Sequence, residues 1–226
     1  MELNVRAAFR ALTGQIGPRP STDNLLQMNR HGELLVANGS ASMEEIVAAG
    51  RAFEVNTGMT TSLDLAAVIA IPTTAIMLAI YNNEPDGGRS YVIDRVTATH
   101  TTAAASLSHA SIIGVLGTTR VAAPTDAVPA GALRALNGMG STDTKVRVVV
   151  NTTIDAVTGI AANWMVLSDS RAVGVTSLPG VSIVGDINGR IIVPPGRYFG
   201  IHVFASAVGH EFNASIQWHE RQMDLG

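Results

Sequence analysis

Residues 212–219 read Phe-Asn-Ala-Ser-Ile-Gln-Trp-His, and this stretch decides the fold class. Apolar side chains at Phe212, Ala214, Ile216 and Trp218 alternate with polar ones. A period of two matches a β-strand that buries one face and leaves the other in water. The stretch therefore predicts a strand with one side packed against a hydrophobic core.

The segment before it carries a similar inner face, made by Phe199, Ile201 and Val203 within residues 197–204. Residues 206–210 separate the two predicted strands and contain Gly209, so we expect them to close a hairpin. Six apolar side chains should then be buried together between two sheets: Phe199, Ile201, Val203, Phe212, Ile216 and Trp218.

Short strand-like segments separated by turn signals fill most of the remaining chain. Strands are predicted over residues 33–37, 75–81, 90–99, 111–116, 145–152, 160–167, 181–185 and 190–193. Asn188-Gly189 is a tight-turn signal that predicts a hairpin into the last of these. Residues 44–55 mix two periods and are ambiguous, with Gly50 arguing against a stable helix. Residues 122–142 predict a long excursion with one helical turn at 132–136.

Many short strands, few helices and no internal repeat predict an all-β fold. We expect a β-sandwich or jelly roll with an extended N-terminal arm. Fewer than about a fifth of the residues should be helical, against about a third in typical globular proteins. Residues 1–29 are assigned to the arm and residues 30–226 to the sandwich, which is large enough to bury a core without staples.

The composition suits a protein that is buried against neighbours. Charged residues make up 15% of the chain, against about 25% in ordinary soluble domains. Lys145 is the sole lysine among 15 basic residues, and arginine is preferred over lysine at interfaces. Codon bias in a GC-rich genome explains the arginine excess equally well. A net charge of −3 indicates no surface for nucleic acid or an anionic membrane.

The sequence predicts neither a leader nor a membrane span. Residues 1–6 lack a basic region followed by an apolar run. The longest apolar stretch, residues 63–80, is interrupted by Asp64 and Pro72. The chain contains no Cys, which excludes disulfides and thiolate metal sites and suits assembly in a reducing cytoplasm.

The first 29 residues have the pattern of an interaction arm. Residues 2–12 predict a short helix that ends near Gly14, and residues 17–24 predict stiff extended chain. A lone helix this short needs a docking partner in water. We hypothesise that the arm clamps a neighbouring subunit or a shell, although it could instead cover an edge of its own sheet. The expected contact residues are Val5, Arg6, Phe9, Arg10, Leu12 and Arg19.

No arrangement of residues predicts catalysis. Residues 39–43 read Gly-Ser-Ala-Ser-Met and do not complete a nucleophile elbow, because the fifth position is not Gly. Lys145 does not follow a Gly-rich phosphate loop. The carboxylates Asp94, Asp155, Asp169 and Glu220 are scattered along the chain, so no pair for glycan hydrolysis can be assigned. We expect no enzyme activity and no cofactor.

Three histidines near the expected hairpin raise the alternative of a zinc site. His202, His210 and His219 would lie on or between its two strands. Glu211 and Glu220 flank the strands without alternating at ligand spacing. The histidines are also explained as polar-face or interface residues, and we expect no metal.

Several short stretches together resemble auxiliary virion proteins of tailed phages. They are residues 30–36, 50–53, 79–83, 91–96, 193–198 and 215–220. The resemblance implies a jelly roll that decorates or cements the capsid and binds the major capsid protein. It also implies self-association at symmetry axes, with a homotrimer favoured and a dimer possible, and a place in the virion. The competing reading is a tail or fibre component that attaches to the host.

Overall fold

The computed structural model describes residues 27–28, 34–35, 43–57, 65–72, 75–104, 106–117, 120, 122–125, 133–138, 144–153, 164–174 and 181–223. The chain divides into two compact units, Met1–Glu44 and Glu45–Gly226. In the first unit β1 (Gln27–Met28) pairs with β2 (Leu34–Leu35) in an antiparallel arrangement. Every other strand described belongs to the second unit, and α1 (Met43–Ala48) contains the division point.

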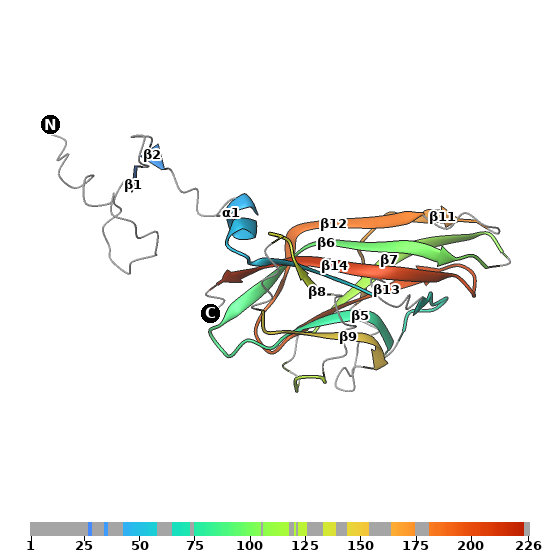
Figure 1. Ribbon diagram of the computed structural model, residues 1–226. Helices are drawn as coiled ribbons and strands as arrows, with labels where there is room; N and C mark the ends of the chain where they lie inside the picture. Colours follow the sequence, from blue (N-terminus) through green and yellow to red (C-terminus); the bar gives the residue numbers. More distant parts are fainter. Residues whose placement is uncertain are drawn as a thin grey trace, which may run out of the picture. The chain divides into compact units, whose positions relative to one another are not determined.

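The second unit is a sandwich of two antiparallel sheets (Figure 1). The first sheet contains β12 (Ser182–Val193), β6 (Arg89–Thr102), β14 (Glu211–Gln222), β3 (Ala52–Asn56) and β8 (Leu133–Ala135) in that order, with β4 (Leu65–Ala66) beside β14. The second contains β10 (Trp164–Val166), β7 (Ser108–Leu116), β13 (Tyr198–Ala205), β5 (Ala75–Asn82) and β9 (Val146–Thr153), with β11 (Arg171–Val173) beside β7. Strands make up 62% of the described residues and helix 4%, which confirms the predicted all-β sandwich.

The strands pair in a nested order that is the jelly-roll arrangement. β3 pairs with β14, β5 with β13, β6 with β12, and β7 with β10 and β11. The first strand of each of these pairs comes ever later in the sequence and its partner ever earlier, so the pairs are nested one inside the next. β8 and β9, from the connection between β7 and β10, add one strand at the edge of each sheet.

The predicted hairpin at residues 206–210 is wrong. β13 and β14 lie in different sheets, so residues 206–210 carry the chain across the sandwich. The alternation in both strands is real, but their apolar faces meet across the core instead of lying side by side. All six residues expected in the core belong to one buried cluster, which confirms that prediction: Phe199, Ile201, Val203, Phe212, Ile216 and Trp218.

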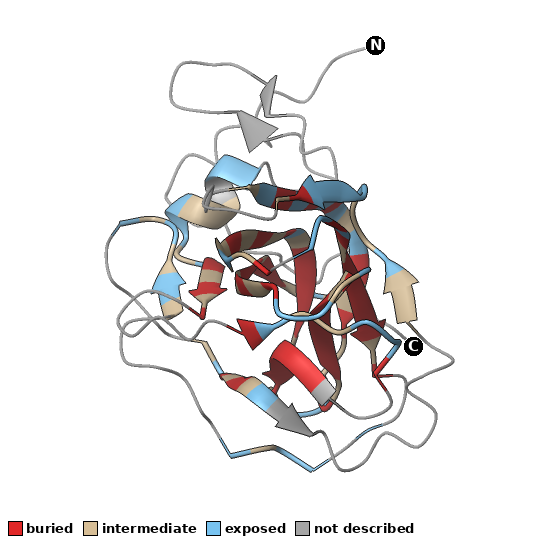
Figure 2. Cartoon of the chain, turned by 90° about the vertical axis from the view of Figure 1, so that its right-hand side faces the viewer, coloured by how far each residue is buried: buried red, intermediate tan, exposed pale blue. Residues whose placement is uncertain are grey.

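Trp218 lies near the middle of this core and is fully buried. Its ring centroid is 5.8 Å from that of Phe53 on β3 and 6.1 Å from that of Tyr91 on β6. Figure 2 looks at one end of the sandwich and shows the buried residues gathered on the strands of both sheets. Because aromatic and β-branched side chains fill the space between the sheets, the core needs no disulfide.

Asn188-Gly189 forms a bulge inside one strand, so the predicted hairpin into residues 190–193 is wrong as well. Both residues have positive φ, 52° and 76°. β12 pairs with β6 on both sides of residues 187–190, which leave the ladder. The Arg190 guanidinium donates to the carbonyl oxygens of Ile187 and Asp186 at 2.9 and 3.0 Å. These bonds close the bulge, and the long neighbour β6 keeps the chain in the sheet.

Residues 44–55 and 132–136 have sequences that fit both helix and strand, and the structure shows what each forms. Residues 44–55 contain the end of α1, a turn at Gly50 with φ of 69°, and then β3. The helical turn predicted at 132–136 is wrong, because residues 133–135 form β8 and pair with the free side of β3. Pairing with an open sheet edge outweighs a weak local helix preference.

Gly185 on β12 packs too closely against its neighbours to tolerate a side chain. A Cβ atom there would lie 2.5 Å from the carbonyl oxygen of Leu167 and 2.8 Å from Val96. A Gly185→Ala substitution should therefore lower the free energy of unfolding by about 1–3 kcal/mol, measured by chemical denaturation. Gly174→Ala is the matched control, since a Cβ atom there meets nothing within 4 Å. Equal losses in the two variants would contradict the packing argument.

Candidate functional site

Three chain connections come together at one end of the sandwich. We call residues 66–72, 103–104, 106–107 and 206–209 the loop cluster; it lies at the right-hand end in Figure 1. The amide of Val68 donates to the carbonyl of Val203 at 2.9 Å. The amide of Ala207 donates to the hydroxyl of Ser108 at 3.1 Å. Hydrogen bonds thus fix the three segments to the ends of the strands that carry them.

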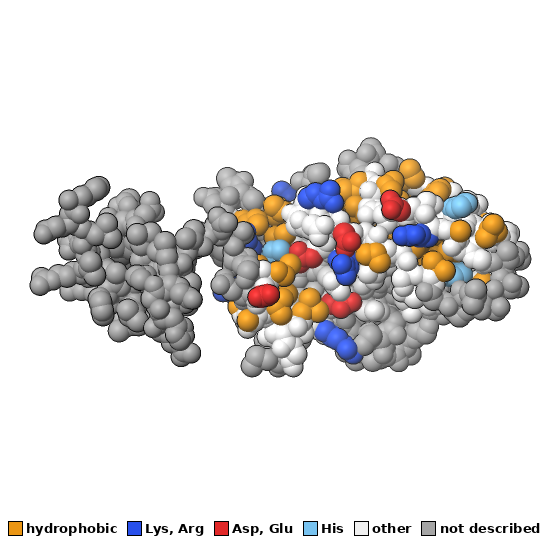
Figure 3. Space-filling model, turned by 90° about the horizontal axis from the view of Figure 1, so that it is seen from above, with side chains coloured by type: hydrophobic (Ala, Val, Ile, Leu, Met, Phe, Trp, Pro, Cys, Tyr) orange, Lys and Arg blue, Asp and Glu red, His pale blue; other side chains and the backbone are white. Residues whose placement is uncertain are grey.

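The surface of the loop cluster is apolar and carries no charge. Its large exposed side chains are Ile69, Ile71, Leu107 and Val208, at 54%, 54%, 62% and 66% exposure. No Asp, Glu, Lys or Arg occurs among its residues. In Figure 3 the acidic and basic side chains lie over the middle and left of the sandwich, while hydrophobic and histidine side chains mark its right-hand end. Exposed apolar side chains gathered at one end of a domain without charges among them favour an interaction surface.

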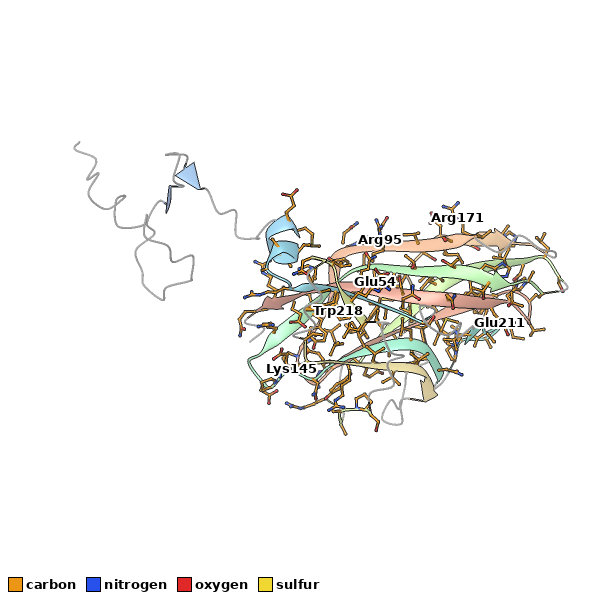
Figure 4. The ribbon with its side chains drawn as sticks, in the orientation of Figure 1. Glu54, Arg95, Lys145, Arg171, Glu211 and Trp218 are labelled. Atoms are coloured by element: carbon orange, nitrogen blue, oxygen red, sulfur yellow. The ribbon has the colours of Figure 1, made fainter. Side chains whose placement is uncertain are left out.

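Charged residues lie next to the loop cluster but outside it. Glu211 begins β14 and Arg171 begins β11, and Figure 4 shows both on the strands that lead to this end. Arg171 is exposed and Glu211 is half-buried. An apolar centre with a charged rim is the usual layout of a protein interface.

The opposite end of the sandwich is held by a polar network. The Asn82 amide donates to the carbonyls of Arg89 and Val193 at 2.8 and 2.9 Å, which joins the β5–β6 and β12–β13 connections. Arg120 forms an exposed ion pair with Asp86. Figure 4 places Lys145 at this end, away from Glu211. The two ends therefore differ in chemistry: one has charged loops and one has uncharged apolar loops.

Glu220 at the charged end is a buried carboxylate within this network. Its side chain is fully buried, lies 3.0 Å from the Arg89 guanidinium, and accepts a hydrogen bond from the Thr144 hydroxyl. Burial raises the pKa of Glu220, while the bonds from Thr144 and Arg89 act in the opposite direction. Burial, and then the charge of Glu220, raise the pKa of the neighbouring Tyr91 phenol. Each polar partner of this carboxylate has a structural role in joining strands.

The three histidines of the zinc alternative do not come together. His202 lies on β13, where its ring bonds to the Val203 carbonyl at 3.2 Å. His219 is in the other sheet, 2.9 Å from Asp94. His210 instead bonds to His100, a residue that the sequence reasoning did not single out. Among the described residues no group of three or more His, Asp or Glu side chains could hold a metal ion.

His100 had one sequence signal. It continues the inward alternation of Val96 and Ala98 on β6, and this pattern would have been enough to predict a buried imidazole, although no such prediction was made. The expected arm contacts, by contrast, fall outside the described residues: Val5, Arg6, Phe9, Arg10, Leu12 and Arg19.

None of the helices in the described part of the chain is long and apolar enough to cross a membrane.

Comparison with known proteins gives no relative on which to base a role. No protein-family model, no curated protein and no solved structure matches the chain.

Proposed function

We propose that this protein is a non-enzymatic structural component of a tailed-phage virion. In this role it decorates or cements the capsid by binding neighbouring subunits of the major capsid protein. The observation that carries the proposal is the uncharged, apolar loop cluster at one end of a rigid jelly roll. Jelly rolls serve in viral capsids as well as in lectins and cupins, so the fold is compatible with the role without implying it.

The size of the loop cluster favours a contact made many times over. Four half-exposed side chains present about 400 Å² of apolar surface, within the range of functional patches. A stable pair of proteins usually buries about 800 Å² on each partner. One loop cluster should thus bind weakly, whereas several copies held together on a repeating shell would bind through avidity. Avidity of this kind favours a homotrimer over a monomer, with a dimer as the second choice.

The alternative role is a tail or fibre component that contacts the host. Copy number in purified particles, measured by quantitative mass spectrometry, separates the two. A cement or decoration protein should be present in numbers comparable to the major capsid protein. A tail component should be far rarer, and absence from particles would contradict both roles.

Val208→Asp should reduce incorporation into particles by about tenfold, because a carboxylate would have to be desolvated in an apolar contact. The readout is the ratio of this protein to the major capsid protein in purified particles. Val166→Asp is the matched control: Val166 is 73% exposed on β10, outside the loop cluster, and its variant should be incorporated normally. Equal incorporation of both variants would rule out the loop cluster as the contact.

A further inference from the structure

Two buried imidazoles lie directly beneath the loop cluster. His100 on β6 is 1% exposed and His210, which precedes β14, is fully buried. The His100 Nε2 atom is 3.1 Å from the His210 Nδ1 atom. The His100 ring also packs against Phe212, with centroids 5.0 Å apart. An apolar wall and a second histidine therefore surround His100.

His210 links the three segments of the loop cluster: it directly follows residues 206–209 and forms hydrogen bonds with the other two segments. Its Nε2 atom is 3.1 Å from the Ser106 carbonyl, and because a carbonyl only accepts, Nε2 carries the hydrogen. Its Nδ1 atom then accepts from His100 Nε2 and from the Ala104 amide, the latter at 3.4 Å. Its backbone carbonyl accepts from the Ala67 amide at 2.8 Å. This hydrogen-bond pattern requires that the His210 ring is neutral, because its Nδ1 atom accepts.

Within the described part of the chain, no acidic side chain lies at ion-pair distance from His100 or His210. Glu211 follows His210 in sequence, is half-buried, and lies opposite Thr102 and Ala66 in the sheet. The nearby β7 contributes exposed His109, and β11 contributes exposed Arg171. Among the described residues neither His100 nor His210 forms an ion pair with a carboxylate. A proton added here would remain uncompensated in an apolar site.

We propose that His100 and His210 form an acid-sensitive latch that holds the loop cluster in its binding shape. Protonation of His210 Nδ1 removes the acceptor used by His100 and Ala104, and two N–H groups then face each other. Protonation of His100 at Nδ1 leaves its Nε2 donor in place but puts a charge into a buried site against Phe212. Separation of the segments brings water to the charged ring, and the apolar side chains then lose their common surface. Release of a capsid partner on acidification follows if the loop cluster is the capsid contact, so that part rests on the proposed function.

The direction of the pH dependence follows from the environment. Burial, and then the neighbouring His210, lower the pKa of His100 below its usual 6.5. Below about pH 6.5, His100 binds a proton more readily in the unfolded chain than in the folded chain, so folding stability falls as the pH falls. Above it both states are neutral and the latch is closed.

Hydrogen–deuterium exchange of the full-length protein tests the latch without any partner. Backbone amides of residues 65–72, 103–109 and 206–210 should exchange about tenfold faster at about pH 5 than at about pH 7.5, after correction for intrinsic rates, while the core of β14 stays protected. His100→Gln keeps a donor toward His210 but does not titrate, so its loops should lose most of this acid response. His109→Gln removes an exposed histidine at the same end and should respond as the wild type does.

Two outcomes would overturn the latch. One is loop exchange in the wild type that does not change with pH; the other is an acid response that survives in His100→Gln. If His100→Gln fails to fold, histidine titration of the wild type by NMR replaces it, and the latch is wrong if both rings titrate without change in loop protection. Particle binding of Val208→Asp at neutral pH tests the proposed function separately. A latch that opens in a protein that never binds capsids would disprove only that function.

Discussion

Replacing Trp218 by alanine should lower the free energy of unfolding by about 3–5 kcal/mol, the largest loss expected from any single truncation in this chain. The indole is fully buried on the central strand β14 and packs between Phe53 and Tyr91, which belong to the strands on either side. Its removal would leave a cavity that flanking β-strands cannot close, because each is held by two neighbours. The measurement is the urea midpoint at constant slope.

Trp164→Ala provides the matched control for this loss. Trp164 is the other of the two tryptophans; it is half-buried on the edge strand β10 and donates from its indole to the Pro72 carbonyl at 2.9 Å. Its truncation should lower the stability clearly less than that of Trp218. Equal midpoints for the two variants would show that the centre of the core lies elsewhere.

Replacing Arg89 by methionine should lower the free energy of unfolding by about 3 kcal/mol at neutral pH, because it leaves the fully buried Glu220 carboxylate without its cation. Arg95→Met is the control: Arg95 pairs with Asp186 at 2.8 Å, but both side chains are about half exposed. An exposed pair contributes less than about 1 kcal/mol. Denaturant unfolding of both variants gives the comparison.

Acid should partly rescue the Arg89→Met variant. Burial already raises the pKa of Glu220 in the folded chain, and Arg89 opposes that rise. Without Arg89 the folded pKa rises further, so the penalty for ionising Glu220 is present above that pKa and disappears as the pH falls through it. The deficit relative to wild type should be smaller at about pH 5 than at about pH 7.5. A deficit that is the same at both pH values would mean that Arg89 acts through packing alone.

The sequence predicted which residues face the core better than it predicted which strands meet. Alternation at Ile216 and Trp218 reports the two faces of one strand, and that information is local. The choice of partner is not local: the same pattern suits a β13–β14 hairpin or a crossing between sheets, and only the sum of all pairings selects the crossing. The hairpin predicted at Asn188-Gly189 was wrong for a related reason, because two successive residues with positive φ occur in a hairpin turn and in a bulge alike.

The loop cluster could not have been predicted from any single segment. Leu107 and Val208 are each an isolated large apolar residue in a loop, which is common on protein surfaces, and Ile69 belongs to the long apolar stretch 63–80. Their significance comes from the nested strand order, which brings three distant connections to one end. His100 and His210 are likewise 110 positions apart, so no spacing rule links them.

Nested pairing also constrains when the chain can fold during synthesis. β3 is among the first strands of the sandwich to leave the ribosome, yet its partner β14 is the last of the described strands. The Thr57 hydroxyl, which directly follows β3, accepts a hydrogen bond from the Ala214 amide, and Ala214 is synthesised 157 positions later. Because β14 is the central strand of its sheet, β6 and β3 have no shared neighbour until β14 has been synthesised. Closing such long loops is slow, and unpaired strand edges stay exposed meanwhile. The sandwich should therefore form only after β14 has been synthesised, and a product truncated before residue 211 should be a substrate for chaperones and proteases.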